Sequence, residues 1–305
     1  MKDIKHFKKV GDYHNLANIA APEHPLISLV DYSQVQYPPD IVTLKWKQDY
    51  YTIGLKRNIA YKLFYGQQEY DFDEGLMTFL APNQVMSLEN NPNVADHRPS
   101  GYLLLIHPDF LWNTPLSKLI KDYDFFGYAA NEALFLSEKE EQMILDILKN
   151  IQREYQSNID KFSQKIIIAQ LELLLNYAER FYERQFITRK ISNHQILGQL
   201  EEVLSEHFKE DNLVEKGLPT VQMVADKLHL SPNYLSSMLK SLTGQSTQQH
   251  IHDKLIDKAK EQLSTTFLTI SEIAYNLGFE RPASFTKLFK NKTNMSPLEF
   301  RKAYN

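Results

Sequence analysis

The pattern of apolar and polar positions divides the chain into two kinds of region. Between about residues 41 and 106, short runs rich in aromatic and branched residues alternate with turn residues, which is typical of β-strands. From about residue 137 onwards, apolar residues recur every three or four positions, which is the spacing of one face of a helix. The pattern predicts an α+β protein, and its 305 residues give room for two domains.

Four runs in the N-terminal part are predicted strands: YYTIGLK, AYKLFY, LMTFLA and GYLLLI. Gly66, Gly75 and the NNPN cluster separate them, and several short strands at this spacing predict a small barrel or sandwich at about residues 20–130. A barrel of this kind can enclose a small effector. From the alternation along the strands, the inward candidates are Tyr51, Ile53, Tyr61, Leu63, Tyr65, Met77 and Phe79. The alternative is a dry, filled core, since aromatic residues at period two are usually core.

Two helical stretches follow, at about residues 137–184. Ser137 and Glu140 form a capping box at the start of the first, whose apolar residues make one stripe. The second stretch, residues 163–184, is apolar on more than one face, so it needs burial on more than one side. We expect one face to pack on the barrel and the other to form a homodimer interface, with the packed interior of the monomer as the alternative. The polar segment at residues 187–195 is the expected domain boundary, a leading helix is expected at about residues 195–208, and the polar stretch 209–217 is an expected loop.

Nearly the same short helix is written twice in the C-terminal part. PNYLSSMLKSLTGQST begins at Pro232 and PASFTKLFKNKTNMSP begins at Pro282, and an offset of fifty places apolar positions on apolar ones. Proline suits the first turn of a helix, and Ser231 is a good N-cap for the first copy, whereas Arg281 is a poorer one. Two copies indicate a duplicated module, because repeat arrays need about three or more.

A second short helical pattern precedes each copy: TVQMVADKL before the first and TISEIAYNLGF before the second. The latter begins with a capping box of Thr269 and Glu272. Two short helices joined by a tight turn form a helix-turn-helix unit, whose second helix can enter the DNA major groove. For one pair, two ordinary helical hairpins would be the better interpretation. Two pairs in the same register, joined by a helical stretch at residues 247–263, favour DNA binding.

The exposed positions of the two predicted recognition helices, at about residues 232–243 and 282–293, supply the candidate DNA contacts. Residues near the start of such a helix reach base edges, and those further along meet phosphates. Lys287 can donate to guanine and Asn233 can pair with adenine. Tyr234 is equally well explained as a core residue. The full set is Asn233, Tyr234, Ser236, Ser237, Lys240, Ala283, Ser284, Thr286, Lys287 and Lys290.

Charge is distributed unevenly along the chain. Residues 218–305 carry eleven Lys and Arg against seven Asp and Glu, a net charge of +4. The whole chain has a net charge of -4, so residues 1–217 carry about -8. A basic C-terminal module on an acidic body is expected of DNA binding, because phosphate neutralisation dominates affinity.

These pieces resemble the C-terminal domain of AraC/XylS-type transcription regulators. The matching segments, over about residues 195–303, are Ala225, SPNYLSSMLK, DKLIDKAKEQL, IAYNLGF, FTKLFK and SPLEFR. The resemblance implies an all-α DNA-binding domain at 191–305, with two helix-turn-helix units joined by a linker helix. DEGLMTFLAP resembles a signature of the cupin-like sensor domain common in this family, which implies a cupin-like β-barrel with a C-terminal helical pair at 1–190, serving as sensor and dimerisation domain.

The sequence also departs from the family pattern. Leu239 stands where the family usually carries an aromatic residue, and Ser237, Lys254 and Lys287 stand where it often carries arginine. The first recognition helix has therefore lost its usual long basic side chain. Sequence preference for DNA cannot be transferred from relatives.

Metal and cofactor chemistry is not indicated. The chain has no cysteine, and no predicted strand carries the two histidines and glutamate with which cupins often hold a metal. His250 and His252 lie in the linker helix with rings pointing apart, and His97 beside Asp96, like His107, is isolated. We expect no metal and no cofactor. No apolar run approaches the length of a membrane span and the N-terminus is too polar for a signal peptide, so we expect a cytoplasmic and, in the family's setting, bacterial protein.

The resulting hypothesis is a sequence-specific DNA-binding transcription regulator, responsive to an effector and not an enzyme. Its partners would be double-stranded DNA, a small-molecule effector and a second copy of the chain through residues 163–184; a contact with RNA polymerase is compatible with this role. Two alternatives stay open. One is a cupin-type metalloenzyme with a helical appendage, and the other is an architectural DNA-binding protein without an effector.

Overall fold

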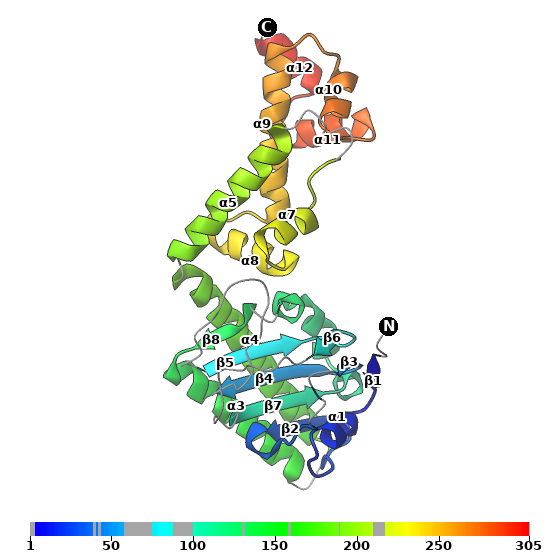
Figure 1. The fold of residues 1–305 in the computed structure, drawn as a ribbon, viewed down its shortest axis with the longest axis vertical. Coiled ribbons are helices and arrows are strands. Elements are labelled where there is room, and N and C mark those ends of the chain that lie inside the picture. The colour runs from blue at the N-terminus through cyan, green and yellow to red at the C-terminus, as the bar shows by residue number, and fades with distance from the viewer. Residues whose placement is uncertain are drawn as a thin grey trace. The chain divides into compact units, whose positions relative to one another are not determined.

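The computed structural model describes residues 4–38, 41, 44–57, 75–87, 100–129, 132–157, 160–188, 190–209 and 217–304. Contacts between residues divide the chain into two compact units, Met1–Gln185 and Phe186–Asn305. The first unit contains all the described strands, followed by two long helices, and the described elements of the second are all helices (Figure 1). A β-rich region followed by an all-α region was predicted from the sequence and is confirmed.

The described strands of the first unit form two sheets. The larger sheet is antiparallel and has the order β2 (Ile27–Asp31), β7 (Ser100–Ile106), β4 (Tyr51–Arg57), β5 (Gly75–Leu80) and β8 (Leu134–Leu136). The smaller has the order β1 (Lys5–Phe7), β3 (Lys45–Gln48) and β6 (Val85–Ser87), with β1 and β3 parallel. The helix α1 (Val10–Leu16) lies between β1 and β2 in the chain order. No closed barrel forms among these described strands.

The predicted strands YYTIGLK, LMTFLA and GYLLLI correspond to β4, β5 and β7. The predicted strand AYKLFY lies outside the described residues. Five described strands were not predicted: β1, β2, β3, β6 and β8. Of these, β1, β6 and β8 are only three residues long and β3 only four, while β2 is buried along four consecutive residues and so lacks the alternation of a half-buried strand.

The two faces of the larger sheet pack against different neighbours. On one face, Ile53 of β4 pairs with Phe79 of β5, and the Phe79 ring lies 4.5 Å from the ring of Phe125 and 6.2 Å from that of Tyr182. Phe125 belongs to the 3-10 helix η5 (Asp124–Gly127) and Tyr182 to α4 (Ser163–Thr188). This face is therefore covered by helical segments.

The opposite face of the larger sheet shares a core with the smaller sheet. Leu103 and Leu105 of β7 lie in one buried cluster with Phe7 of β1 and Trp46 of β3. In the register of the sheet, Gly54 and Thr52 of β4 stand beside these two leucines and so belong to the same face.

Tyr51, Ile53, Met77 and Phe79, the candidates for a barrel interior, occupy the helix-covered face of the larger sheet and not the face shared with the smaller sheet. All four are buried, and Tyr51 packs edge-on against Phe126. The physical reason is that β4 is buried on both faces from Tyr51 to Leu55, so alternation along the strand cannot identify the interior face. Tyr61, Leu63 and Tyr65 lie outside the described residues.

Two helices complete the first unit. The helix α3 (Glu138–Gln156) begins with the predicted capping box, in which the Ser137 N–H donates to the Glu140 carboxylate over 2.9 Å. The helix α4 buries most of its apolar residues, among them Leu171, Leu174 and Ala178. Ile166 and Leu173 remain 44% and 42% exposed, so the wide apolar stripe is only partly used within one chain.

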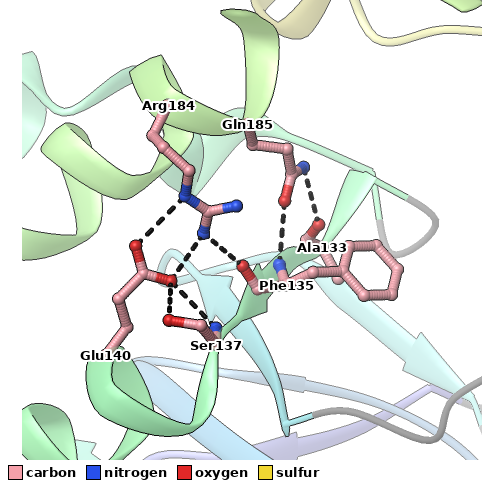
Figure 2. A network of polar contacts seen from close by, with 6 residues as sticks. All are labelled: Ala133, Phe135, Ser137, Glu140, Arg184 and Gln185. Carbon is pink, nitrogen blue, oxygen red and sulfur yellow. Dashed lines mark hydrogen bonds and ion pairs between the residues drawn. The ribbon is translucent and has the colours of Figure 1, made fainter. Parts of the chain in front are cut away.

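Residues near the end of α4 satisfy the backbone of β8, an edge strand (Figure 2). Gln185 accepts from the Phe135 N–H over 2.9 Å and donates to the Ala133 carbonyl over 3.2 Å, as a neighbouring strand would. Arg184 donates to the Phe135 carbonyl over 2.7 Å and to both carboxylate oxygens of Glu140. The edge is thereby protected from pairing with another chain, and the capping residue of α3 also holds α4.

The second unit is a succession of helices. They are α5 (Lys190–Lys209), α7 (Val221–Leu228), α8 (Pro232–Thr243), α9 (Thr247–Thr265), α10 (Ile270–Asn276), α11 (Pro282–Thr293) and α12 (Pro297–Tyr304). The predicted leading helix is α5, which begins earlier than expected. The segment 187–195, predicted as a polar boundary, is helical in its described residues, and most of the predicted loop at 209–217 lies outside the described residues. No described helix combines the length and apolar composition that a membrane-spanning segment requires.

Candidate nucleic-acid interface

The helices α8 and α11 end in the same hydrogen-bonded turn. The Gly244 N–H donates to the Lys240 carbonyl over 2.9 Å, and the Asn294 N–H donates to the Lys290 carbonyl over 2.8 Å. Gly244 and Asn294 are both left-handed, with φ of 76° and 58°. The hydroxyl of Thr243 donates to the Leu239 carbonyl over 2.8 Å, and Thr293 repeats this bond one copy later. The duplication read from the sequence is thus confirmed in backbone detail.

The turns that precede α8 and α11 are also related. The Leu230 N–H donates to the Ala225 carbonyl, and the Phe279 N–H donates to the Ala274 carbonyl, each over 3.0 Å. Both alanines are fully buried, which allows the two helices of each pair to approach closely. Corresponding residues of the two turns are 49 positions apart in the sequence, whereas the prolines that follow are fifty apart. The second turn therefore holds one residue more before its proline.

Gly278 in the second turn meets two backbone requirements at once. Its φ of 85° is in the left-handed region, which favours glycine. A Cβ at this position would also lie 3.0 Å from the carbonyl carbon of Gly217 and 3.1 Å from the Leu218 nitrogen. At the corresponding place in the first turn, His229 adopts a φ of 56°.

The starts of the helices follow the predicted capping pattern. Ser231 Oγ accepts from the Tyr234 N–H over 3.2 Å, whereas Arg281 makes no side-chain cap bond to α11. The capping box before α10 is present, with the Thr269 N–H donating to Glu272 over 2.6 Å. The hydrogen bonds from Thr269 lower the pKa of the Glu272 carboxyl.

The long helix α9 is packed against both pairs. Thr247 at its start is fully buried and shares a 3.0 Å hydrogen bond with the Ser236 hydroxyl of α8. Further along, Leu255 and Ala259 lie in one core cluster with Phe285 and Phe289 of α11. A single helix therefore fixes both recognition helices.

The structure brings most of the sequence-predicted DNA contacts onto two exposed faces. Asn233 and Lys240 of α8 are exposed, and Ser237 is half-buried. On α11 the exposed residues are Ala283, Ser284, Lys287 and Lys290, and Thr286 is half-buried.

Two predicted contact residues have roles inside the unit. Tyr234 is only 8% exposed, and its ring packs edge-on against Phe186 with centroids 5.2 Å apart, as the core alternative had it. The Ser236 hydroxyl is engaged with Thr247. Two cations were not among the predicted contacts: Arg281 is exposed just before α11, and Lys292 of α11 forms an ion pair with Asp253 of α9 over 2.7 Å. Of the two, only Arg281 could have been noticed from the sequence, because it stands at an N-cap position without a side chain that caps a helix.

The histidines of α9 make local contacts. His250 Nε2 and the Thr243 hydroxyl are 2.9 Å apart, and His252 contacts Gln248. Burial lowers the pKa of both imidazoles. His107 and its neighbour Asp109 form a pair at 3.4 Å, while His97 and Asp96 lie outside the described residues. Within the described ranges, no group of three or more His, Cys, Asp or Glu is placed to hold a metal ion.

Comparisons with known proteins match the same C-terminal region. The sequence model of a helix-turn-helix domain family matches residues 224–303. The chain is 31% identical over 116 residues to the uncharacterized HTH-type transcriptional regulator YobQ of Bacillus subtilis, covering 36% of this chain and 47% of that protein. It is 34% identical over 98 residues to the arabinose operon regulatory protein of Escherichia coli, covering 32% of each. The matched part thus spans less than half the length of these relatives.

Solved structures are also similar to part of the chain. The C-terminal domain of the two-component response regulator yesN from Fusobacterium nucleatum shares 31% identity with a TM-score of 0.30, covering 33% of this chain and 93% of that one. The DNA-binding domain of AdpA, solved in complex with a target DNA, shares 25% identity with a TM-score of 0.30, covering 34% of this chain and 91% of that one.

Proposed function

We propose that this chain, whose residues 224–303 form an AraC-type helix-turn-helix DNA-binding domain, is a sequence-specific transcription regulator. The supporting observation is the pair of helix-turn-helix units with matching hydrogen-bonded turns, each exposing polar side chains on its second helix. In this proposal α8 and α11 read two successive major-groove faces, about 34 Å apart on one side of the duplex. Membership of a transcription-regulator domain family disfavours the metalloenzyme alternative.

The proposed contacts divide by chemistry. Near the helix starts, Asn233 would pair with adenine, and Lys287 would donate to guanine. Lys240 and Lys290 stand further along their helices and would meet phosphates. Small side chains beside them would contact sugar, phosphate or thymine methyl groups; these are Ser237, Ala283, Ser284 and Thr286. Tyr234 and Ser236 would hold α8 in place, because their side chains are engaged inside the unit.

Selection from a pool of random DNA duplexes by the full-length protein tests this function. We expect an enriched motif with two conserved blocks whose centres are about 10 base pairs apart. Enrichment of bent or A·T-rich DNA without such a motif would instead support the architectural role.

We also propose that the N-terminal region is a cupin-like sensor of a small molecule. Two sheets that share a core, followed by two helices, support this interpretation. The cavity beside Phe79 has a volume of only about 40 Å³, which suits a water or two. This small volume supports the filled-core alternative for the described inward candidates Tyr51, Ile53, Met77 and Phe79.

A larger pocket offers more room for an effector. Its volume is about 680 Å³, within the usual range of small-molecule sites of about 300–1,000 Å³. Its polar lining includes Asp12, Asn15, Asn18, Gln36 and Tyr37, which suits a ligand with several hydrogen-bonding groups. An effector would alter transcription only if it bound two arrangements of the protein with different affinity.

A native mass spectrum of the purified full-length protein reports a retained ligand and the oligomer mass together. We expect a dimer that carries a discrete small-molecule adduct. A bare protein whose mass spectrum and melting temperature stay unchanged across a metabolite panel would contradict the sensor proposal.

For the dimer, we propose the exposed side of α4, where Ile166 and Leu173 stand two turns apart. An apolar patch of this kind is suited to a second copy of the same helix. The double substitution Ile166→Glu and Leu173→Glu should convert the dimer to a monomer in analytical ultracentrifugation. Met143→Glu is the matched control, because Met143 of α3 is 43% exposed and undergoes the same chemical change. A dimer that survives the double substitution would contradict this interface.

A further inference from the structure

Asp253 occupies a special place in the middle of α9. Its Oδ1 accepts a 2.7 Å hydrogen bond from the Lys292 ammonium group, in the last turn of α11. Its Oδ2 accepts a 2.9 Å hydrogen bond from the Gln245 side-chain amide, in the turn that follows α8. One carboxylate therefore joins the last turn of α11 to the turn that follows α8.

The position of Asp253 along α9 explains why it can reach both segments. Thr247, six residues earlier, packs on the first helix pair, and Leu255, two residues later, belongs to the core of the second. Asp253 thus stands where α9 passes from one pair to the other. Since α9 has 19 residues, it is about 28 Å long and can contact both pairs.

The carboxylate contacts a part of α11 that lies beyond its buried aromatic residues. Phe285 and Phe289 hold the first two turns of α11 against α9, but both lie before the last turn. The only described ion pair between α11 and α9 is that of Lys292, which holds the last turn. Partial burial raises the pKa of Asp253, but the hydrogen bond and charge of Lys292 outweigh it and leave the pKa below its usual value.

Neutralisation of Lys292 has a second consequence. Lys287, Lys290 and Lys292 are all exposed residues of this helix, but the Lys292 ammonium group lies 2.7 Å from the Asp253 carboxylate. A lysine held in an ion pair contributes less to phosphate binding than one in solvent. Asp253 thereby limits the non-specific attraction of α11 for DNA.

We propose that Asp253 is a positioning residue that fixes the relative placement of α8 and α11, and so determines which spacing of DNA half-sites the protein accepts. The inference rests on the proposed function, because it requires that both helices read DNA. It assigns a specificity role to a residue that need not touch a base.

The test compares three variants of the full-length protein. Asp253→Asn keeps the size of the side chain but removes its charge, and Lys292→Gln removes the partner. Asp257→Asn is the matched control, because Asp257 lies one turn further along α9, is 72% exposed and is 3.9 Å from Lys260. The probes are the duplex selected by the wild-type protein, the same duplex with one base pair inserted between its two blocks, and a scrambled duplex.

We expect the wild type and Asp257→Asn to discriminate equally between the original and the lengthened duplex. Loss of a partly exposed ion pair should reduce that discrimination about fivefold in both Asp253→Asn and Lys292→Gln. The two variants should differ on scrambled DNA: Asp253→Asn should bind about threefold more tightly, because Lys292 is released to phosphate, and Lys292→Gln should not.

Each outcome has a definite meaning. Unchanged spacing discrimination in Asp253→Asn and Lys292→Gln, with a normal circular dichroism spectrum, would overturn the inference while leaving the proposed function intact. If the wild-type selection yields no motif, or a motif with one conserved block, the two-helix function itself fails. A loss of helix in Asp253→Asn but not in Lys292→Gln leaves the second variant to decide.

Discussion

The two helix-turn-helix pairs share a backbone but differ in charge. Their second helices end in the same left-handed turn and repeat the same threonine-to-carbonyl bond. Yet residues 218–246 carry a net charge of only +1, whereas residues 270–305 carry +3. The buried positions and the closing turns preserve the scaffold, while the exposed positions have diverged. We infer that the second pair supplies most of the phosphate attraction and the first relies on neutral polar contacts.

The residues that precede α8 and α11 also differ in charge, again with the more basic residue in the second pair. Ser231 caps α8, but Arg281 occupies the corresponding place before α11 and makes no cap bond. A cation at a helix N-terminus is unfavourable for the helix macrodipole. An arginine there is explained if it serves DNA binding at some expense of helix stability.

Truncation of one buried residue in each helix pair tests whether the two pairs are equally essential to the stability of the unit. Phe289 and Leu239 are both fully buried at matching positions of α11 and α8. Phe289→Ala should lower the free energy of unfolding by about 3–5 kcal/mol, and Leu239→Ala by about 2–5 kcal/mol, through lost burial and the cavities left behind. Urea unfolding followed by circular dichroism measures both. Leu298→Ala is the control, because Leu298 is 53% exposed. If either substitution lowers the free energy of unfolding by less than about 1 kcal/mol, the helix pair that contains it is not essential to the stability of the unit.

The next effect concerns DNA recognition by the second pair. Lys287→Ala should weaken binding to a selected site by about 1–3 kcal/mol. Its effect on binding to scrambled DNA should be smaller, because a base contact is sequence-specific. Lys240→Ala should instead weaken binding to both duplexes similarly. It should also reduce the salt dependence of binding by the amount expected for about one phosphate contact. Fluorescence anisotropy titrations at several salt concentrations measure these changes. Lys227→Ala, on the exposed side of α7, is the control. Equal losses on both duplexes would make Lys287 a phosphate contact.

The smallest effect contrasts the helix caps. Ser231→Ala should destabilise the helical unit by about 1 kcal/mol, because one N–H of α8 loses its acceptor. Arg281→Ser should stabilise it by a similar amount, about 1 kcal/mol or less, while weakening DNA binding. Thermal unfolding and DNA titration of the same two variants provide the comparison. If Arg281→Ser leaves DNA affinity unchanged, the arginine has no role in binding.

Local signals explain why the helical unit could be predicted. Ser231 before Pro232, the Thr269–Glu272 capping box and the buried Ala225 each leave a recognisable pattern over a few residues. Because the unit is duplicated, each copy also checks the other. The chemistry of its exposed residues follows from the same helical register.

The parts that could not be predicted depend on contacts distant in sequence. Asp253 and Lys292 are 39 residues apart, and nothing near either residue indicates the pair. The same holds for Arg184, which reaches Glu140 across 44 residues. For β4 the difficulty is different: both of its faces are buried, so the alternation that predicts a strand does not predict which face meets the helices.

The proposed function requires that both α8 and α11 read DNA. Hydroxyl-radical footprinting of the full-length protein on its selected duplex tests whether they do. We predict two protected patches on one side of the duplex, with centres about 10 base pairs apart, and we expect Lys287→Ala to weaken one patch more than the other. A single protected patch, or uniform weak protection along the duplex, would contradict the claim.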